Sequence, residues 1–335
     1  MLDVASRGSR IVNGKIYKLI DLFAGVGGMR IAFENVFKKK SKVVFSSEID
    51  ESAKKTYTLN HGEKPAGDIT KIHESKIPNH DIVLGGFPCQ AFSVAGKRMG
   101  FDDTRGTLFF EVARIIKYHK PEIVFLENVK NLYTHDKGAT FKIIKETLIE
   151  LGYLVFHDIL NAKNYDLPQN RERLFIIGFK NPDAKFKFPK PKKAIKTIHN
   201  CILDSAKVEE KYYYNNKPLY EKIKNDVKCP NTVYQWRRKY VRANQSGVCP
   251  TLTANMGTGG HNVPIIKDEK GVRRLTPREC SYFQGFPETF KFPHGMIDSR
   301  LYKLFGNSVP IALVEEIAKE VKITLENLHT IKLEA

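Results

Sequence analysis

Apolar and polar positions follow two different periods along the first half of the chain. Short continuous apolar runs predict buried strands, at residues 17–23, 42–45, 81–87, 123–126, 154–160 and 173–178. Between these runs apolar residues recur at helical spacing, as in the helix marked by Met29, Phe33 and Phe37. Strands that alternate with amphipathic helices indicate a doubly wound, mostly parallel α/β sheet, in which ligands bind at the carboxyl ends of the strands.

The pattern changes at about residue 183. The stretch 186–196 (FKFPKPKKAIK) is basic and contains two prolines, and strands and helices no longer alternate clearly after it. We therefore expect a first domain at residues 1–182, a smaller second domain at 183–295 and a C-terminal segment at 296–335. A helix expected over 310–327 carries apolar residues on one face, so that it can pack back on the first domain.

The net charge suggests a polyanionic partner. The 335 residues include 55 Lys and Arg against 37 Asp and Glu, a net charge of +18. The excess is concentrated in residues 180–242, which hold 17 basic and 6 acidic residues. Clustered positive charge of this kind most often serves nucleic acid, although a generally lysine-rich composition would supply part of the same excess. Trp236 lies in this basic region and is expected to anchor a small core rather than to contact a base.

Several other function classes are disfavoured by composition. The five cysteines, at positions 89, 201, 229, 249 and 280, are odd in number and never spaced as CxxC. This pattern argues against a disulfide framework and against a structural zinc site, so we predict no metal. The chain has no apolar run of 18 residues and its first residues contain no apolar core of signal-peptide length. We therefore expect a cytoplasmic protein that does not use a membrane.

Three motifs at predicted strand ends point to a nucleoside ligand. Residues 23–28 (FAGVGG) form a glycine-rich turn between the first strand and a helix, where a ligand can approach the backbone. Glu48 ends the second strand, in the position from which an acid accepts hydrogen bonds from ribose hydroxyls. Asp68 lies where the next loop could meet an adenine amino group. Each acid alone could be a solvated surface residue, but together with the turn they favour an adenosine site.

A second group of residues indicates covalent chemistry. The third strand ends in two glycines, Phe87, Pro88 and Cys89, so that one thiol is presented at the edge of the sheet. Glu127 ends a wholly apolar strand, where burial raises a carboxyl pKa and suits a group that carries a proton. Cys89 could instead be a small buried hydrophobe, and Glu127 a helix-capping or ion-paired acid. Arg171 and Arg173 stand just before a strand and would ordinarily be surface arginines.

Seven motifs resemble, in order, those of the bacterial C5-cytosine DNA methyltransferases of type II restriction–modification systems. They are DLFAGVGG, GGFPCQAFSVAGKR, DTRGTLFF, ENV, QNRERLFIIGF, RRLTPREC with FQGFP, and LYKLFGNSVP, and they cover about residues 17–321. A glycine turn is common, but the order of PCQ, ENV, QxRxR and GNSV is highly specific. The resemblance implies S-adenosylmethionine as cofactor and the 5-carbon of cytosine in duplex DNA as methyl acceptor. It also implies a Rossmann-like methyltransferase sheet with a target-recognition domain.

The same resemblance assigns roles residue by residue. It implies that Cys89 is the nucleophile, that Glu127 contacts the cytosine ring, and that Arg171 and Arg173 lie against the flipped nucleotide. The implied cofactor-binding residues are Phe23, Gly25, Gly27, Glu48, Ile49, Asp68, Ile69, Pro88 and Asn307. The candidate DNA-binding residues are Lys97, Arg98, Arg237, Arg238, Arg242, Thr253, Asn255 and Gly257. Residues 91–100 would form a loop that closes over the base.

Three other functions would share part of this pattern. A tRNA cytosine methyltransferase would share the motifs but would lack a long recognition segment such as 183–270. A non-catalytic DNA-binding relative would be expected to lose Cys89 or Glu127, and both are present. A nicotinamide-dependent dehydrogenase fits the strand order but explains neither PCQ nor the basic region. We expect a monomer that is paired in function with a restriction endonuclease without a stable complex, and that protects host DNA from it.

Overall fold

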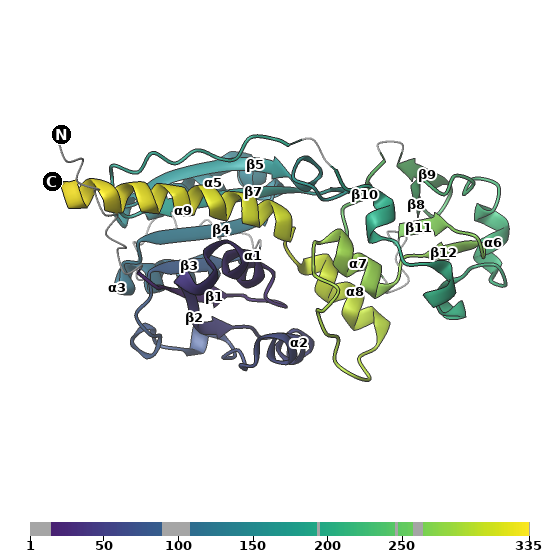
Figure 1. Ribbon diagram of the computed structural model, residues 1–335, viewed down its shortest axis with the longest axis horizontal. Coiled ribbons are helices and arrows are strands. Elements are labelled where there is room, and N and C mark those ends of the chain that lie inside the picture. Colours follow the sequence, from purple (N-terminus) through teal and green to yellow (C-terminus); the bar gives the residue numbers. More distant parts are fainter. Residues whose placement is uncertain (1–14, 89–107, 193–194, 245–246, 257–263, 335) are drawn as a thin grey trace, which may run out of the picture.

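The computed structural model describes residues 15–88, 108–192, 195–244, 247–256 and 264–334. Figure 1 shows a large sheet covered by helices, a second and smaller sheet, and helices α7 (Pro277–Phe283) and α8 (Asp298–Asn307) between them. Among the described residues, no helix combines the length and apolar character needed to cross a membrane.

The large sheet has six strands and is mostly parallel. Its order is β2 (Ser41–Ser47), β1 (Tyr17–Leu22), β3 (Ile82–Gly85), β4 (Ile123–Val129), β7 (Glu172–Phe179) and β5 (Leu154–Asn161). Only β7 is reversed, because it pairs antiparallel with both β4 and β5. The predicted mostly parallel, doubly wound α/β fold is therefore confirmed. The third strand is shorter than predicted, since pairing ends at Gly85, before Phe87.

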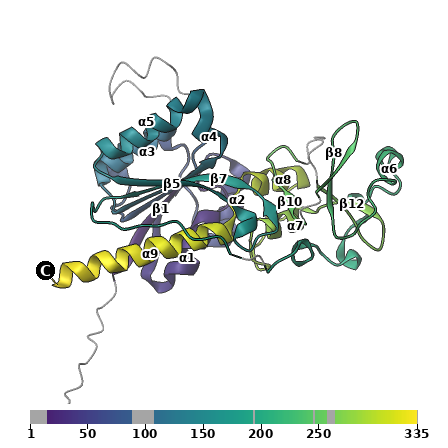
Figure 2. The same ribbon diagram turned by 90° about the horizontal axis from the view of Figure 1, so that it is seen from above.

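Both faces of this sheet are buried, which explains the continuous apolar runs of its strands. In β4, Ile123 and Phe125 join the core formed with α1 (Gly28–Phe37) and α9 (Ile311–Glu334). Val124 and Leu126 point to the opposite face and join the core formed with α3 (Leu108–His119) and α5 (Ala139–Glu150). Figure 2 shows these two pairs of helices on opposite sides of the sheet. The C-terminal helix packs against α1, as predicted, and continues to residue 334.

The ends of the helices follow ordinary capping chemistry. Helix α2 (Glu51–His61) begins at Asp50, whose carboxylate accepts hydrogen bonds from the N–H groups of Ser52 and Ala53. It ends at Gly62, which adopts the left-handed conformation with φ 76°. Because α2 follows β2 directly, its capped N-terminus lies at the carboxyl end of the sheet. The short helices are α4 (Asn131–Thr134) and α6 (Pro218–Ile223).

The second sheet is antiparallel, in the order β12 (Val272–Arg274), β11 (Pro264–Lys267), β8 (Val233–Trp236) and β9 (Val241–Asn244). It has a small core of its own, formed by Ile223, Val227, Tyr234, Ile265 and Val272. Trp236 is partly buried and packs against this core, as predicted. Just past the expected domain boundary at residue 183, Phe186 contacts Phe156 and Phe179 of the large sheet.

Candidate active site

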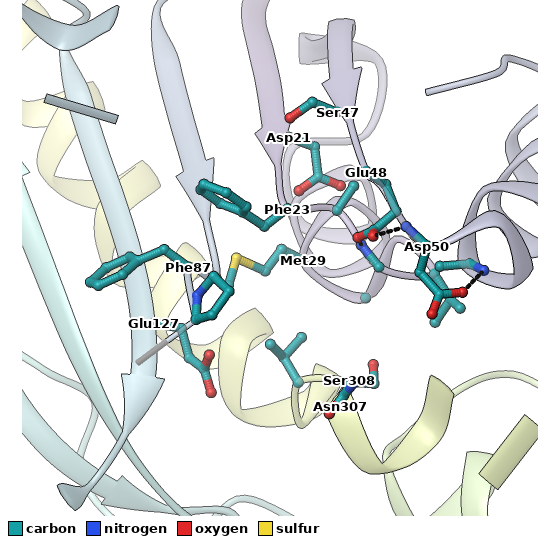
Figure 3. Close-up of a pocket in the computed structure, with 18 of the residues that line it drawn as sticks. Asp21, Phe23, Met29, Ser47, Glu48, Asp50, Phe87, Glu127, Asn307 and Ser308 are labelled. Atoms are coloured by element: carbon teal, nitrogen blue, oxygen red, sulfur yellow. Dashed lines mark hydrogen bonds between the residues drawn. The ribbon is translucent and has the colours of Figure 1, made fainter. Parts of the chain in front are cut away.

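A cavity of about 380 Å³ lies at the carboxyl ends of β1, β2, β3 and β4. Its walls come from the glycine turn after β1, the loops after β2 and β3, the end of β4 and the turn after α8. Figure 3 shows acidic side chains around it, with Glu48 and Asp50 on one side and Glu127 on another. Nearly all of the sequence-predicted cofactor and catalytic residues that the structure describes line this one cavity.

The turn after β1 is held in a conformation that leaves room beside the backbone. Phe23, Gly25 and Gly27 all have positive φ, at 55°, 55° and 86°. A side chain rarely adopts this region, so Phe23 occupies a strained position such as is common at binding sites. A Cβ atom on Gly27 would lie 2.2 Å from Nε2 of His61, whereas one on Gly25 would meet no atom within 4 Å. The turn is therefore supported from behind by His61 and open at Gly25, which lines the cavity.

Glu48 is fixed in place by backbone N–H groups. Its Oε2 accepts a hydrogen bond from Gly25 N (2.8 Å), and its Oε1 accepts from Ile49 N (2.8 Å) and Asp50 N (2.7 Å). A carboxylate has about four acceptor positions, so these three bonds leave capacity for a ligand hydroxyl. The neighbouring Ile49 is 69% exposed at the cavity edge, where an apolar ligand surface would cover it.

Asp68 and Ile69 form the next part of the wall. The Asp68 carboxylate accepts hydrogen bonds from both the hydroxyl and the backbone N–H of Thr70, and these bonds lower its pKa. The carboxylate therefore remains ionised over a wide pH range as an acceptor. Ile69 is buried and lines the cavity beside it.

The predicted nucleophile follows the last described residue of its loop. Phe87 and Pro88 both line the cavity, and Phe87 is packed against Phe109 with ring centroids 5.7 Å apart. Cys89 itself, and the DNA-binding candidates Lys97, Arg98 and Gly257, lie outside the described residues, as does the loop predicted at 91–100.

Glu127 is buried in the cavity wall against an arginine. Its Oε1 lies 2.9 Å from Nε of Arg173, and each of these side chains is only 11% exposed. Burial raises the pKa of Glu127 above its ordinary value, and this effect outweighs the opposing charges of Arg173 and Arg171. Burial likewise lowers the pKa of Arg173, partly offset by Glu127. Glu127 is thus suited to hold a proton, and the Arg173 guanidinium lies beside it as a cation.

Arg171 is buried, which differs from the surface position ordinarily expected for it. It is 1% exposed and donates hydrogen bonds to the backbone carbonyls of Leu252 (2.7 Å), Gly306 (3.0 Å) and Ser308 (2.5 Å). Its Nε has no hydrogen-bond partner among the described residues, and the residue lines the cavity. The Nη groups therefore join chain segments, and the Nε donor is left for a ligand.

Asn307 closes the opposite wall. It is the last residue of α8, is exposed, and lines the cavity beside Ser308. One turn earlier on this helix, Lys303 forms an ion pair with Asp50 at 2.7 Å. Although partial burial raises the pKa of Asp50, the bond from Lys303 and the two helix N–H groups bring it below its ordinary value. The ion pair fastens α8 to the N-terminus of α2 at the edge of the cavity.

Two polar residues of the cavity were not singled out from the sequence. Asp21 of β1 and Ser47 of β2 are each only 2% exposed, and both line the cavity. Asp21 Oδ2 and Ser47 Oγ have no hydrogen-bond partner in the part of the chain that the structure describes. Burial raises the pKa of Asp21 well above its ordinary value, against the influence of Arg30. A charged residue within an apolar strand, as in YKLIDL, was a signal available in the sequence.

The candidate DNA-binding residues lie in two places. Arg237, Arg238 and Arg242 belong to the hairpin of β8 and β9, where Arg238 and Arg242 are exposed and Arg238 has a φ of 66°. Thr253 and Asn255 follow β10 (Cys249–Pro250), and the Thr253 hydroxyl donates to Asn255 Oδ1 at 2.6 Å. Thr253 and Asn255 lie much nearer the cavity than the hairpin does, because Gly306, which lines the cavity, packs directly on the Thr253 backbone. The described residues contain no cluster of His, Cys, Asp and Glu that could hold a metal ion.

Known proteins resemble this chain over most of its length. The sequence model described as C-5 cytosine-specific DNA methylase matches residues 17–323. The type II methyltransferase M.Bsp6I of Bacillus sp. (strain RFL6) is 46% identical over 311 residues, covering 91% of this chain and 98% of that protein. M1.ScrFI of Lactococcus lactis subsp. cremoris is 47% identical over 321 residues, covering 92% and 79%. The Entamoeba histolytica methyltransferase EhMeth shares the fold, with a TM-score of 0.73 at 20% identity, covering 93% of this chain and 99% of that one.

The chain therefore belongs to the C-5 cytosine-specific DNA methylase family. Membership of this family makes it an enzyme, a DNA (cytosine-5-)-methyltransferase of the type II group.

Proposed function

We propose that the protein transfers a methyl group from S-adenosylmethionine to carbon 5 of a cytosine in a short duplex DNA sequence, with Cys89 as nucleophile. The observation that carries this proposal is the composition of one cavity. It joins an adenosine-type wall (Phe23, Glu48 and Asp68) to the buried Glu127–Arg173 pair, and it is bounded by the loop that leads into Cys89.

The residues present fit the cofactor. Glu48 retains acceptor capacity for ribose hydroxyls, Asp68 is an ionised acceptor for an amino group, and Phe23 offers an aromatic face at the turn. The unpartnered Asp21 Oδ2 and Ser47 Oγ would take donors from the polar end of the molecule. Gly25, Gly27, Ile49, Ile69, Pro88 and Asn307 would complete the site. When bound, the cofactor supplies a methyl group activated by the positive charge on its sulfur.

The protein side chains would activate the cytosine ring. Carbon 5 is a poor nucleophile, so a thiolate of Cys89 would first form a bond to C6, which places negative charge on the ring. Glu127 would donate its proton toward N3 and stabilise that charge, and Arg173 would hold Glu127 in place. After C5 is methylated, water would take the C5 proton, the ring double bond would re-form, and the Cys89 thiolate would be expelled. N3 would return its proton to Glu127.

The substrate would be reached by extrusion of the base from the duplex, since a stacked cytosine cannot enter a cavity. Residues 183–295 would recognise the target, with Arg237, Arg238 and Arg242 on the second sheet and Thr253 and Asn255 nearer the cavity. Lys97, Arg98 and Gly257 would contribute from segments outside the described residues. We further propose that a monomer acts in the cytoplasm, without a stable complex, to protect host DNA from a cognate endonuclease.

Replacing Cys89 by Ser is expected to lower methyl transfer by at least about 10³-fold, because a hydroxyl is a far weaker nucleophile than a thiolate. Transfer of labelled methyl groups to duplex DNA and to tRNA measures both activity and substrate class. Cys229→Ser is the matched control, because Cys229 is exposed and outside the cavity. Duplex DNA with 5-fluorocytosine at the target, once that is mapped by bisulfite sequencing, should trap the wild type covalently, since fluorine cannot leave as a proton. Methylation of DNA by Cys89→Ser, or of tRNA alone by the wild type, would refute the proposal.

Replacing Glu48 by Gln is expected to weaken S-adenosylmethionine binding about 10- to 100-fold. Hydrogen bonds to the charged carboxylate are worth about 1.5–3 kcal/mol, and the neutral amide weakens them. The amide also replaces one oxygen that accepts backbone N–H groups with an NH2 donor. Calorimetric titration without DNA measures the effect directly. Glu51→Gln, three residues along the chain and exposed, should bind the cofactor as the wild type does. If the two variants bound S-adenosylmethionine with equal affinity, Glu48 would not be a cofactor-binding residue.

A further inference from the structure

The loop that carries Asp68 joins α2 to β3 and has little regular structure. Residues 62–81, all of which the structure describes, form no strand and only two single turns of 3-10 helix. The N–H of Ala66 donates to Ser46 O at 2.8 Å, and its carbonyl accepts a hydrogen bond from Glu48 N at 2.9 Å. The loop is therefore fixed to the end of β2 two residues before Asp68.

Arg114 of α3 holds the same loop on the other side of Asp68. Its Nη2 donates hydrogen bonds to Ile69 O at 2.7 Å and to Ile72 O at 2.8 Å. Ile69 is the residue next to Asp68, and its buried side chain lines the cavity. Asp68 is thus placed between a bridge to β2 and a guanidinium that grips the two carbonyls after it.

Two carboxylates fix the direction of the Arg114 guanidinium. Glu111, three residues earlier on α3, accepts from Nε at 2.7 Å, and Glu74 of the loop accepts from Nη1 at 2.8 Å. A planar fork held at all three nitrogens presents its donors in one geometry, which the single ammonium of a lysine does not reproduce. The three side chains are 14–25% exposed, so their ion pairs contribute little to stability and the fold should survive their replacement.

The loop presents one carboxylate oxygen of Asp68 to a ligand. Both hydrogen bonds from Thr70 use Oδ1, so that Oδ2 remains as an acceptor. Resting on the proposed function, we propose that Arg114 is a positioning residue for adenine specificity. By holding the Ile69 carbonyl, it keeps Asp68 Oδ2 where the 6-amino group of adenine donates to it. A nucleoside with an acceptor at that position is then rejected.

The specificity is measured as a ratio of two dissociation constants. S-adenosylhomocysteine and S-inosylhomocysteine, which has an oxygen in place of the 6-amino group, are each titrated by calorimetry without DNA. The wild type should prefer the adenosine ligand about 10- to 100-fold, which corresponds to one charged hydrogen bond. In Arg114→Lys this ratio should fall about 10-fold, because only S-adenosylhomocysteine loses affinity. Arg300→Lys, exposed on α8 and outside the cavity, is the matched control and should keep the wild-type ratio.

Asp68→Asn distinguishes positioning from a general structural role. This variant alone should bind S-adenosylhomocysteine about 10- to 100-fold more weakly than the wild type, because the amide does not accept as a carboxylate does. Since Arg114 acts through Asp68, adding Arg114→Lys to Asp68→Asn should weaken binding no further. If the two losses of affinity were instead additive, Arg114 would act on the cavity by another route and the proposal would be wrong.

A second variant covers the case in which Arg114→Lys does not fold by circular dichroism. Glu74→Gln combined with Glu111→Gln keeps the guanidinium but removes both carboxylates that direct it, and the ratio should again fall. An unchanged ratio in the folded variants, or a wild-type ratio of one, would overturn the positioning role. A wild type that binds neither ligand would instead refute the proposed function.

Discussion

The Glu127→Gln variant is expected to transfer methyl groups about 10²- to 10⁴-fold more slowly than the wild type. The Glu127 side chain is 11% exposed, and its pKa is raised mainly because burial disfavours the charged form. An amide can still donate a hydrogen bond toward a ring nitrogen, but it cannot deliver a proton to it. Cofactor affinity should change little, since the ribose and adenine contacts lie on the other wall of the cavity. Single-turnover transfer to duplex DNA separates this effect from binding.

The pH dependence of the methyl-transfer rate tests whether Glu127 acts in its protonated form. An acid with a raised pKa holds its proton below that pKa and loses it as the pH increases through it. The wild-type rate should therefore decline on the alkaline side as Glu127 ionises, and Glu127→Gln should lack that decline. Glu172→Gln is the matched control on β7, where the carboxylate is exposed and paired with Lys130 at 3.0 Å. If Glu127→Gln showed the same pH profile as the wild type, Glu127 would not act as an acid in the mechanism.

The sequence predicted the large sheet well because its strands are buried on both faces. Strands such as β4 read as uninterrupted apolar runs, and the intervening helices carry one apolar face. The second sheet carried no such signal. Its strands are only three or four residues long, and β6 (Gln169–Asn170) and β10 have two residues each. Strands this short are set by their partners in space, so propensity and periodicity cannot identify them.

The position of the cavity could be predicted from the same strand pattern, whereas the burial of Arg171 could not. Glu48 follows β2 directly, Glu127 lies near the end of β4, and Asp68 lies two residues after Ala66, which bridges the last residue of β2. Parallel strands bring their carboxyl ends to one edge of a sheet, so these acids meet there. The partners of Arg171 lie 81 to 137 residues further along the chain, and all of them are backbone carbonyls. No side-chain pattern marks a carbonyl, so burial of this arginine could not be inferred from local sequence.

Replacing Arg273 by Met is expected to lower the free energy of unfolding by about 3–5 kcal/mol. Arg273 of β12 is 0% exposed and forms two bonds to Glu279 of α7, at 2.9 and 2.8 Å, and one to Asp268. Glu279 is also 0% exposed, so the variant leaves a buried carboxylate without its cation. Chemical denaturation followed by fluorescence and circular dichroism measures the loss.

Two further variants distinguish the loss of the Arg273–Glu279 ion pair from the loss of side-chain packing. Arg273→Met combined with Glu279→Gln removes both charges and should recover part of the lost stability, because the buried charge is no longer uncompensated. Lys319→Met breaks an exposed pair with Glu316 and should cost less than about 1 kcal/mol. Since Arg273 lies on the second sheet and Glu279 on α7, the first variant should loosen that sheet before the large one unfolds. A loss below about 1 kcal/mol in Arg273→Met would mean that water reaches Glu279 and that the pair does not hold the two parts together.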